Sequence, residues 1–330
     1  EADLIVCRDE KIIQVHDFGT LDVKLELKSE AASYDAVLSP DPKFFFSVHD
    51  NEKICMWDLQ VGRCVRTFQG HRNFIRSIVA SPNGTHFATG SEDGTIRVWN
   101  IETGCQEKIF KLGASTLSLA FLNNRNQIAA GMDDGWVFLF DMKPLPFDRA
   151  LPIQQNQVTG FAINREGSLL LSSSSDSTVR VWDLGQNGQP KNLKSHTGWV
   201  TALRISPNST YAISGSADGS IIMWDLLEMK EKRKLPAHQD EVIDVDISQD
   251  SQRILTVGAD RVIRILNANT GKQECELETD HTATCARFHS NCVQIFFSST
   301  DCSIHTFDIP SNSEGSKLCG HTNTVNYICL

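Results

Sequence analysis

Several features that direct a protein to a membrane, a secretory route or a disulfide framework are missing from this sequence of 330 residues. No apolar run approaches the about 18–20 residues of a membrane-spanning helix, and we expect no signal peptide. Ten cysteines are present, yet no two of them form a Cys-x-x-Cys pair. The scattered cysteines therefore predict free thiols in a cytoplasmic or nuclear protein.

An excess of positive charge is also missing. The formal net charge is −10 and the isoelectric point is near 5.5, which argues against direct nucleic-acid binding because that requires a basic surface. The sequence contains no glycine-rich phosphate loop, no zinc signature and no paired-carboxylate motif. We therefore expect no cofactor and no metal site.

What the sequence does contain is one unit repeated along its whole length. A marker position, usually aromatic, recurs at steps of 41 or 42 residues. This period lies within the about 40–45 residues of a four-stranded propeller blade. The marker residues are His16, Trp57, Trp99, Phe140, Trp182, Trp224, Leu266 and Phe307.

Each unit repeats the same order of strands and turns. In the unit from Gly70 to Phe110, three β-type runs are separated by Ser-Pro-Asn-Gly and Glu-Asp-Gly turns, and a fourth run follows Glu-Thr-Gly. A Gly-His pair precedes the first strand, an Asp precedes the third, and Trp-Asp or a variant ends the third. With these motifs in register, the whole chain resembles the WD-repeat family of β-propellers.

The fold predicted from the repeat is an all-β, closed eight-bladed WD-repeat β-propeller forming a single domain over residues 1–330. Seven continuous blades occupy residues 29–319. The opening segment 1–28 reads as three strands without a first strand, and residues 320–330 supply that strand after a Gly-His pair. Completing the first blade with the C-terminal strand would leave no open sheet edge. The alternative is seven blades plus a fragment of a neighbouring propeller.

Some repeats combine a hydroxyl, an imidazole and a carboxylate, the residue types of a hydrolase triad. The resemblance implies a structural role instead: Asp accepts from His, His accepts from the hydroxyl, and the hydroxyl oxygen accepts the indole N–H. With every polar atom used internally and no Gly-x-Ser-x-Gly motif, we expect no enzyme and no catalytic residue. The predicted network consists of His71, Thr89, Asp93 and Trp99 in one blade and His196, Ser214, Asp218 and Trp224 in another.

Other blades keep only part of this network. The unit of Asp260 has Leu266 in place of Trp, and the unit of Asp176 has no loop histidine. We expect these blades to depend more on apolar packing.

Residues that the blade itself does not need are candidates for binding. In propellers that this chain resembles, partners usually meet the face formed by the loops between blades and the turns between second and third strands. Exposed aromatic residues on such a face are frequent hot spots. His49 flanks one of these turns and is expected at the same rim. The predicted partner-binding residues are Phe74, Arg76, Trp199, Trp136, Tyr34, Arg8, Glu241 and Asn326.

The sequence thus predicts a non-catalytic scaffold that binds one or more proteins or peptides as a subunit of a multiprotein complex. One alternative is a peptide or phosphopeptide receptor, such as the substrate module of a ubiquitin ligase, in which Arg8 and Arg76 would hold an acidic motif. Another is an RNA-associated propeller of a ribosome-assembly complex. Prolines between Lys143 and Gln157 predict that the fourth strand there is short or absent.

Overall fold

The computed structural model describes residues 4–8, 12–16, 23–41, 43–122, 127–142, 149–151, 156–185, 190–318 and 325–329. Within these ranges every regular element is a β-strand, and no helix long and apolar enough to cross a membrane is present. The chain divides into two compact units, Glu1–Val158 with Cys329–Leu330, and Thr159–Ile328.

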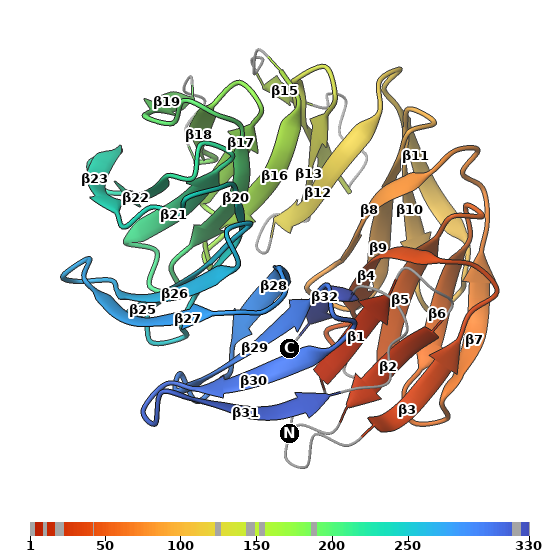
Figure 1. The fold of residues 1–330 in the computed structure, drawn as a ribbon. Helices are drawn as coiled ribbons and strands as arrows, with labels where there is room; N and C mark the ends of the chain where they lie inside the picture. The colour runs from red at the N-terminus through yellow and green to blue at the C-terminus, as the bar shows by residue number, and fades with distance from the viewer. Residues whose placement is uncertain are drawn as a thin grey trace. The chain divides into compact units, whose positions relative to one another are not determined.

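The first unit holds three complete four-stranded sheets (Figure 1), ordered β4-β5-β6-β7, β11-β10-β9-β8 and β12-β13-β14-β15. A further sheet has the order β3-β2-β1-β32, of which β1 to β3 and Cys329 belong to this unit. The strands are β1 (Leu4–Arg8), β2 (Ile12–His16), β3 (Val23–Lys28), β4 (Ser33–Leu38), β5 (Phe44–His49), β6 (Ile54–Asp58), β7 (Arg63–Phe68), β8 (Ile75–Ala80), β9 (His86–Ser91), β10 (Thr95–Asn100), β11 (Gln106–Lys111), β12 (Thr116–Leu122), β13 (Gln127–Met132), β14 (Val137–Asp141), β15 (Arg149–Leu151) and β32 (Val325–Cys329).

The second unit holds four four-stranded sheets, each built from consecutive strands in the order of the chain. The strands are β16 (Val158–Ile163), β17 (Leu169–Ser174), β18 (Thr178–Asp183), β19 (Lys191–Lys194), β20 (Val200–Ile205), β21 (Tyr211–Ser216), β22 (Ile221–Asp225), β23 (Lys230–Leu235), β24 (Val242–Ile247), β25 (Arg253–Gly258), β26 (Val262–Asn267), β27 (Gln273–Glu278), β28 (Ala283–Phe288), β29 (Gln294–Ser299), β30 (Ile304–Asp308) and β31 (Ser313–Leu318).

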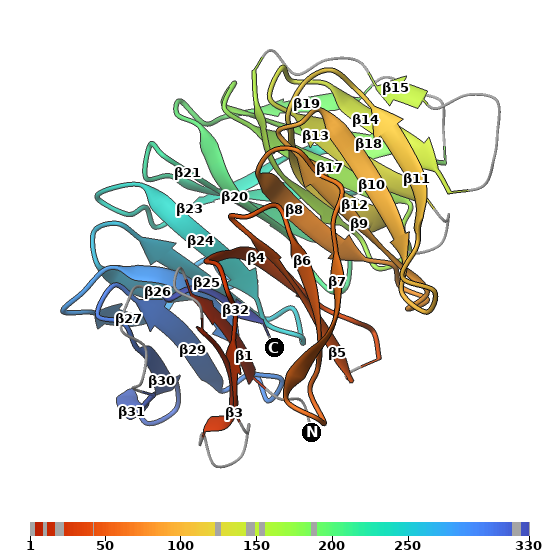
Figure 2. The ribbon, with the colours of Figure 1, turned by 90° about the vertical axis from the view of Figure 1, so that its right-hand side faces the viewer.

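The sheet of β8 to β11 shows why the repeat folds in this way (Figure 2). The second strand, β9, is almost wholly buried, whereas the outer strand, β11, alternates exposed and partly buried residues. The turn between β9 and β10 closes at Gly94, whose φ of 72° is readily adopted by glycine. The inner strand is therefore buried on both faces, and the outer strand is half solvated.

Neighbouring sheets within a unit are held together by apolar side chains from their facing surfaces. In the first unit Phe46 and Phe68 pack against Phe87 of the next sheet, with ring centroids 4.7 and 4.8 Å apart. The Trp99 ring stacks on Phe87 at 6.1 Å. The marker tryptophan therefore belongs to the core between two sheets.

The eight four-stranded sheets confirm the predicted all-β fold and eight blades, with β32 completing the first sheet. The seven-blade alternative does not fit this count. In the proline-containing segment the fourth strand, β15, is described over 3 residues. Residues 143–148 and 152–155, which include the three prolines, lie outside the described ranges, so a short or absent fourth strand stays a prediction.

Candidate functional site

The blade of β8 to β11 contains a complete polar network. His71 Nδ1 donates to Asp93 at 2.9 Å, and the Thr89 hydroxyl donates to His71 Nε2 at 2.8 Å. The same hydroxyl oxygen accepts the indole N–H of Trp99 at 3.0 Å. Thr89 is completely buried. The Thr89 hydroxyl therefore donates one hydrogen bond and accepts another inside the blade, and a substrate cannot reach it.

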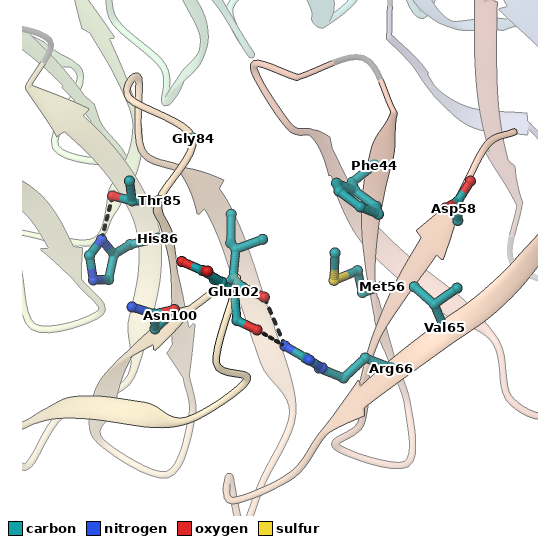
Figure 3. A pocket seen from close by; sticks show the side chains of 11 residues that line it. Phe44, Met56, Asp58, Val65, Arg66, Gly84, Thr85, His86, Asn100 and Glu102 are labelled. Carbon is teal, nitrogen blue, oxygen red and sulfur yellow. Dashed lines mark hydrogen bonds between the residues drawn. The ribbon is translucent and has the colours of Figure 1, made fainter.

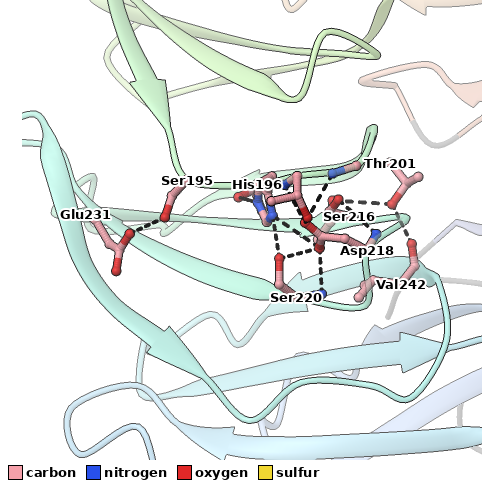
Figure 4. Close-up of polar contacts among 12 residues, drawn as sticks. Ser195, His196, Thr201, Ser216, Asp218, Ser220, Glu231 and Val242 are labelled. Atoms are coloured by element: carbon pink, nitrogen blue, oxygen red, sulfur yellow. Dashed lines mark hydrogen bonds and ion pairs between the residues drawn. The ribbon is translucent and has the colours of Figure 1, made fainter.

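The corresponding network in the blade of β20 to β23 contains one additional residue (Figure 4). Ser214 donates to His196 Nε2 at 2.6 Å and accepts the Trp224 indole N–H at 2.8 Å. His196 Nδ1, however, donates to Ser220 at 2.6 Å, and Ser220 donates to Asp218 at 2.5 Å. The expected direct hydrogen bond between His196 and Asp218 is absent, because their nearest atoms lie 3.7 Å apart. Ser220 bridges the two groups.

The electrostatics of these networks favour a neutral ring beside an ionised carboxylate. Burial lowers the pKa of His71 and of His196 below the ordinary value. Burial acts to raise the pKa of Asp93, but hydrogen bonds from Thr95, the Arg72 N–H and His71 outweigh it and leave that pKa lowered. Asp218 likewise has a lowered pKa, since Ser220 and Thr197 donate to it.

The blade of β4 to β7 obtains its imidazole from a different place. Trp57 Nε1 donates to Ser47 at 2.8 Å, and the Ser47 hydroxyl meets His49 Nε2 at 2.8 Å. His49 is the last residue of β5 and donates from Nδ1 to the carbonyl oxygen of Ala31 at 3.1 Å. His49 is buried, so the expectation that it lies on the rim is wrong: its side chain fills the position that a loop histidine occupies in other blades.

In two other blades an arginine two residues before the marker position lies near the turn carboxylate. Where no loop histidine is present, Arg180 lies 3.6 Å from Asp176 and both side chains are nearly buried. In the blade that carries Leu266, Arg264 lies 3.7 Å from Asp260. The expectation that these blades depend more on apolar packing stays a prediction; in the blade of Leu266, His238 keeps its hydrogen bonds with Asp260 and Thr256.

At the edge of the first unit, Phe74 and Arg76 lie together. Phe74 is 40% exposed, and the Arg76 guanidinium is 6.0 Å from the centroid of its ring. Arg76 Nε also donates to Glu92 at 2.6 Å. The Phe74 side chain is thus accessible to a binding partner, whereas the Arg76 guanidinium is already paired with Glu92.

In the second unit, Trp199 directly precedes β20 and is 60% exposed. Its carbonyl oxygen accepts the N–H of Ala217 at 2.8 Å, which fixes it beside the turn between β21 and β22. Glu241 holds the same place in the next blade, where its carbonyl accepts the Ala259 N–H at 2.8 Å, and it is also exposed. Both residues occupy the strand edge that sequence register predicts.

The remaining predicted rim residues are less accessible or lie outside the description. Trp136 is half-buried and stacks on Phe138 with ring centroids 5.8 Å apart, so its ring packs on its own blade. The side chains of Arg8, Tyr34 and Asn326 are outside the described part of the structure, although their backbones lie in β1, β4 and β32.

A cavity of about 700 Å³ lies at the opposite strand edge of the first unit (Figure 3). Phe44, Met56 and Val65 form its apolar part. Arg66 reaches across it and donates to the carbonyl oxygens of Ile101 and Glu102 at 2.8 and 3.0 Å. Sequence reasoning missed this cavity because side chains from two different repeats form it.

Four segments match the family model described as WD domain, G-beta repeat: residues 62–100, 149–183, 188–225 and 229–267. Each match ends at or beside a Trp-Asp position or its variant. The chain is a WD-repeat protein.

Two curated relatives extend the similarity. The WD-repeat chain is 30% identical to Transducin-like enhancer protein 2 of Mus musculus over 182 residues, which is 54% of this chain and 24% of the relative. It is also 30% identical to Protein groucho of Drosophila melanogaster over 183 residues, 54% of this chain and 25% of that protein. The match thus spans about a quarter of the length of these relatives.

Among solved structures, the crystal structure of the computationally designed Ika8 protein is similar, with a TM-score of 0.77. The similarity covers 90% of each chain at 24% sequence identity. At this identity the likeness supports the fold alone.

Proposed function

We propose that this WD-repeat protein is a non-catalytic scaffold and a subunit of a multiprotein complex. Its partners would bind at the blade edges formed by the loops before each first strand and the turns between second and third strands. The observation that carries this proposal is the exposure of Trp199, which is 60% exposed, whereas the marker tryptophans are buried. An exposed indole at a sheet edge offers large contact area at little entropic cost.

Phe74 supports the same proposal in the first unit. It occupies the equivalent repeat position and is 40% exposed. Arg76 beside it already pairs with Glu92, which disfavours a phosphopeptide receptor because a phosphate site needs available cations. We therefore propose protein or peptide partners recognised through aromatic contacts.

The proposal that the protein is not an enzyme rests on the network hydroxyls, which are buried and already hydrogen-bonded. Thr89 and Ser214 are completely buried, and each is hydrogen-bonded to an imidazole and an indole. A nucleophile must reach the reacting atom of its substrate. These two hydroxyls do not meet that requirement.

Location is also part of the proposal. The seven cysteines with described side chains are all free. Free thiols are usual in reducing compartments, which supports a cytoplasmic or nuclear protein.

Affinity capture with quantitative mass spectrometry tests this function. The baits are wild type, Phe74→Ala, Trp199→Ala and Leu227→Ala. Leu227 is the matched control because it is 83% exposed in the turn after β22, at the opposite edge of the blade from Trp199. We expect partners to be lost selectively from the Trp199 or Phe74 variant. Identical partners on all four baits would contradict binding at this edge.

A further inference from the structure

The cavity at the strand edge of the first unit has a counterpart in the second unit, where the repeat places equivalent residues. Phe44 and Tyr211 hold the same repeat position, because each pairs with the aspartate directly after the marker tryptophan. Tyr211 is buried, and its hydroxyl donates to the carbonyl oxygen of Ser251 at 3.0 Å. Ser251 lies in the turn between β24 and β25 of the next sheet. In the second unit a phenol therefore bridges two neighbouring sheets.

This bridge is missing at the cavity. Gly84 holds the place of Ser251, because the N–H of each donates to the carbonyl oxygen of the serine that begins its turn. Phe44 has no hydroxyl that could donate to the Gly84 carbonyl. Gly84 also has no side chain, whereas Ser251 Oγ accepts the N–H of Asn208 at 3.3 Å. Both contacts that join the two sheets in the second unit are thus lacking here, which leaves a space of about 700 Å³.

The walls of the cavity favour an aromatic ring. Phe44, Met56 and Val65 contribute apolar surface, and Val65 is 43% exposed. In the second unit Lys232 holds the place of Val65, so the apolar wall belongs to this cavity and is not a property of the repeat. The Arg66 guanidinium lies across the cavity, where main-chain carbonyls hold it (Figure 3), and it forms no ion pair with a described residue. A planar guanidinium stacks well on aromatic rings.

The polar groups of the lining predict a hydrogen-bond donor on that ring and a cation beside it. Asp58, His86 and Asn100 already have hydrogen-bond partners within their own blades. Two acceptors have no donor or cation among the described residues: the carbonyl oxygen of Gly84 and the exposed carboxylate of Glu102. A phenol hydroxyl satisfies the first, as it does in the second unit. A lysine or arginine side chain satisfies the second.

We propose that this cavity is a docking site for a tyrosine of a partner protein that has a basic residue next to it. The tyrosine ring lies between the apolar wall and Arg66, its hydroxyl donates to the Gly84 carbonyl, and the basic side chain pairs with Glu102. A volume of about 700 Å³ lies within the about 300–1,000 Å³ usual for binding pockets. The site is separate from the edge that carries Phe74 and is a second binding surface.

The test is an NMR titration of isotope-labelled methionine methyl groups with the peptide acetyl-Gly-Lys-Tyr-Lys-Gly-amide. The chain has only 5 methionines, so each methyl signal can be assigned. Met56 lines the cavity, and Met223 holds the same position in the second unit. We expect a saturable ring-current shift at Met56, with half-saturation below about 1 mM, and no shift at Met223. The same peptide with phenylalanine in place of tyrosine should bind about fivefold more weakly, because it lacks the donor.

Three variants check the individual contacts. In Phe44→Tyr the new hydroxyl donates to the Gly84 carbonyl from within, so the tyrosine and phenylalanine peptides should bind equally. Glu102→Gln removes the charge at nearly constant shape and should weaken both peptides about two- to fivefold. Tyr211→Phe is the matched control in the second unit and should leave the titration of Met56 unchanged.

Four results would overturn the proposal. The first is a Met56 methyl signal that does not shift with the tyrosine peptide. The second is equal binding of the two peptides to wild type, and the third is a preference for tyrosine that persists in a folded Phe44→Tyr variant. The fourth is unchanged affinity in Glu102→Gln, because the basic neighbour would then have no partner.

Discussion

The hydroxyl of Thr89 tests whether the buried networks hold the blades together. Thr89→Val replaces the hydroxyl by a methyl group of nearly the same shape, so little packing volume changes. The Trp99 indole N–H and His71 Nε2 would both lose their partner. A buried polar group without a partner costs about 1–3 kcal/mol, so two such groups predict a loss of about 2–6 kcal/mol in the free energy of unfolding.

Thr256→Val is the matched comparison. Leu266 replaces the marker tryptophan in that blade. The Thr256 hydroxyl therefore has His238 as its network partner without an indole, and its oxygen lies 3.0 Å from His238 Nε2. One unpaired group predicts a loss of about 1–3 kcal/mol, roughly half that of Thr89→Val. Guanidinium unfolding followed by tryptophan fluorescence and circular dichroism measures both losses, with unchanged m-values required for comparison. Equal losses, or a loss below about 0.5 kcal/mol for Thr89→Val, would refute the reasoning.

Three further predictions concern stability. Burial raises the pKa of Asp35 to about 6, so this carboxyl binds its proton more tightly in the native state; the stability of wild type relative to Asp35→Asn should therefore rise as pH falls from about 7 to about 4 in urea unfolding at several pH values. Gly258→Ala would push a Cβ into the His238 ring, and thermal unfolding should show a loss of about 1–3 kcal/mol. Arg180→Met leaves Asp176 without its cation, which predicts a loss on the order of 3 kcal/mol in chemical denaturation.

The repeat architecture could be read from the sequence because strand alternation and turn residues recur at a fixed period. The network of His71, Thr89 and Asp93 was predictable for the same reason, since its residues hold fixed places relative to the turns. Two details were not predictable: His49 takes the place of a loop histidine in its blade, and Ser220 bridges His196 and Asp218. Both depend on which side chain reaches a buried position. Similar residue types in sequence thus gave different hydrogen-bond partners.

The candidate binding surface was likewise predictable only in part. The exposure of Trp199 and Phe74 follows from their register just before a first strand. The half-buried position of Trp136 does not, because it results from stacking on Phe138. Neither could the cavity be predicted, since side chains from neighbouring repeats form its walls. Contacts within a repeat follow from its period, whereas contacts between repeats depend on particular side chains.

The central claim is that this WD-repeat scaffold binds its partners through exposed aromatic residues at one blade edge. The most direct test measures the dissociation constant of one captured partner for wild type, Trp199→Ala and Leu227→Ala. If Trp199 is a hot spot worth about 2 kcal/mol, its variant should bind roughly 30-fold more weakly, while Leu227→Ala should stay within about twofold of wild type. Equal affinity of the two variants, or a larger loss for Leu227→Ala, would contradict the account.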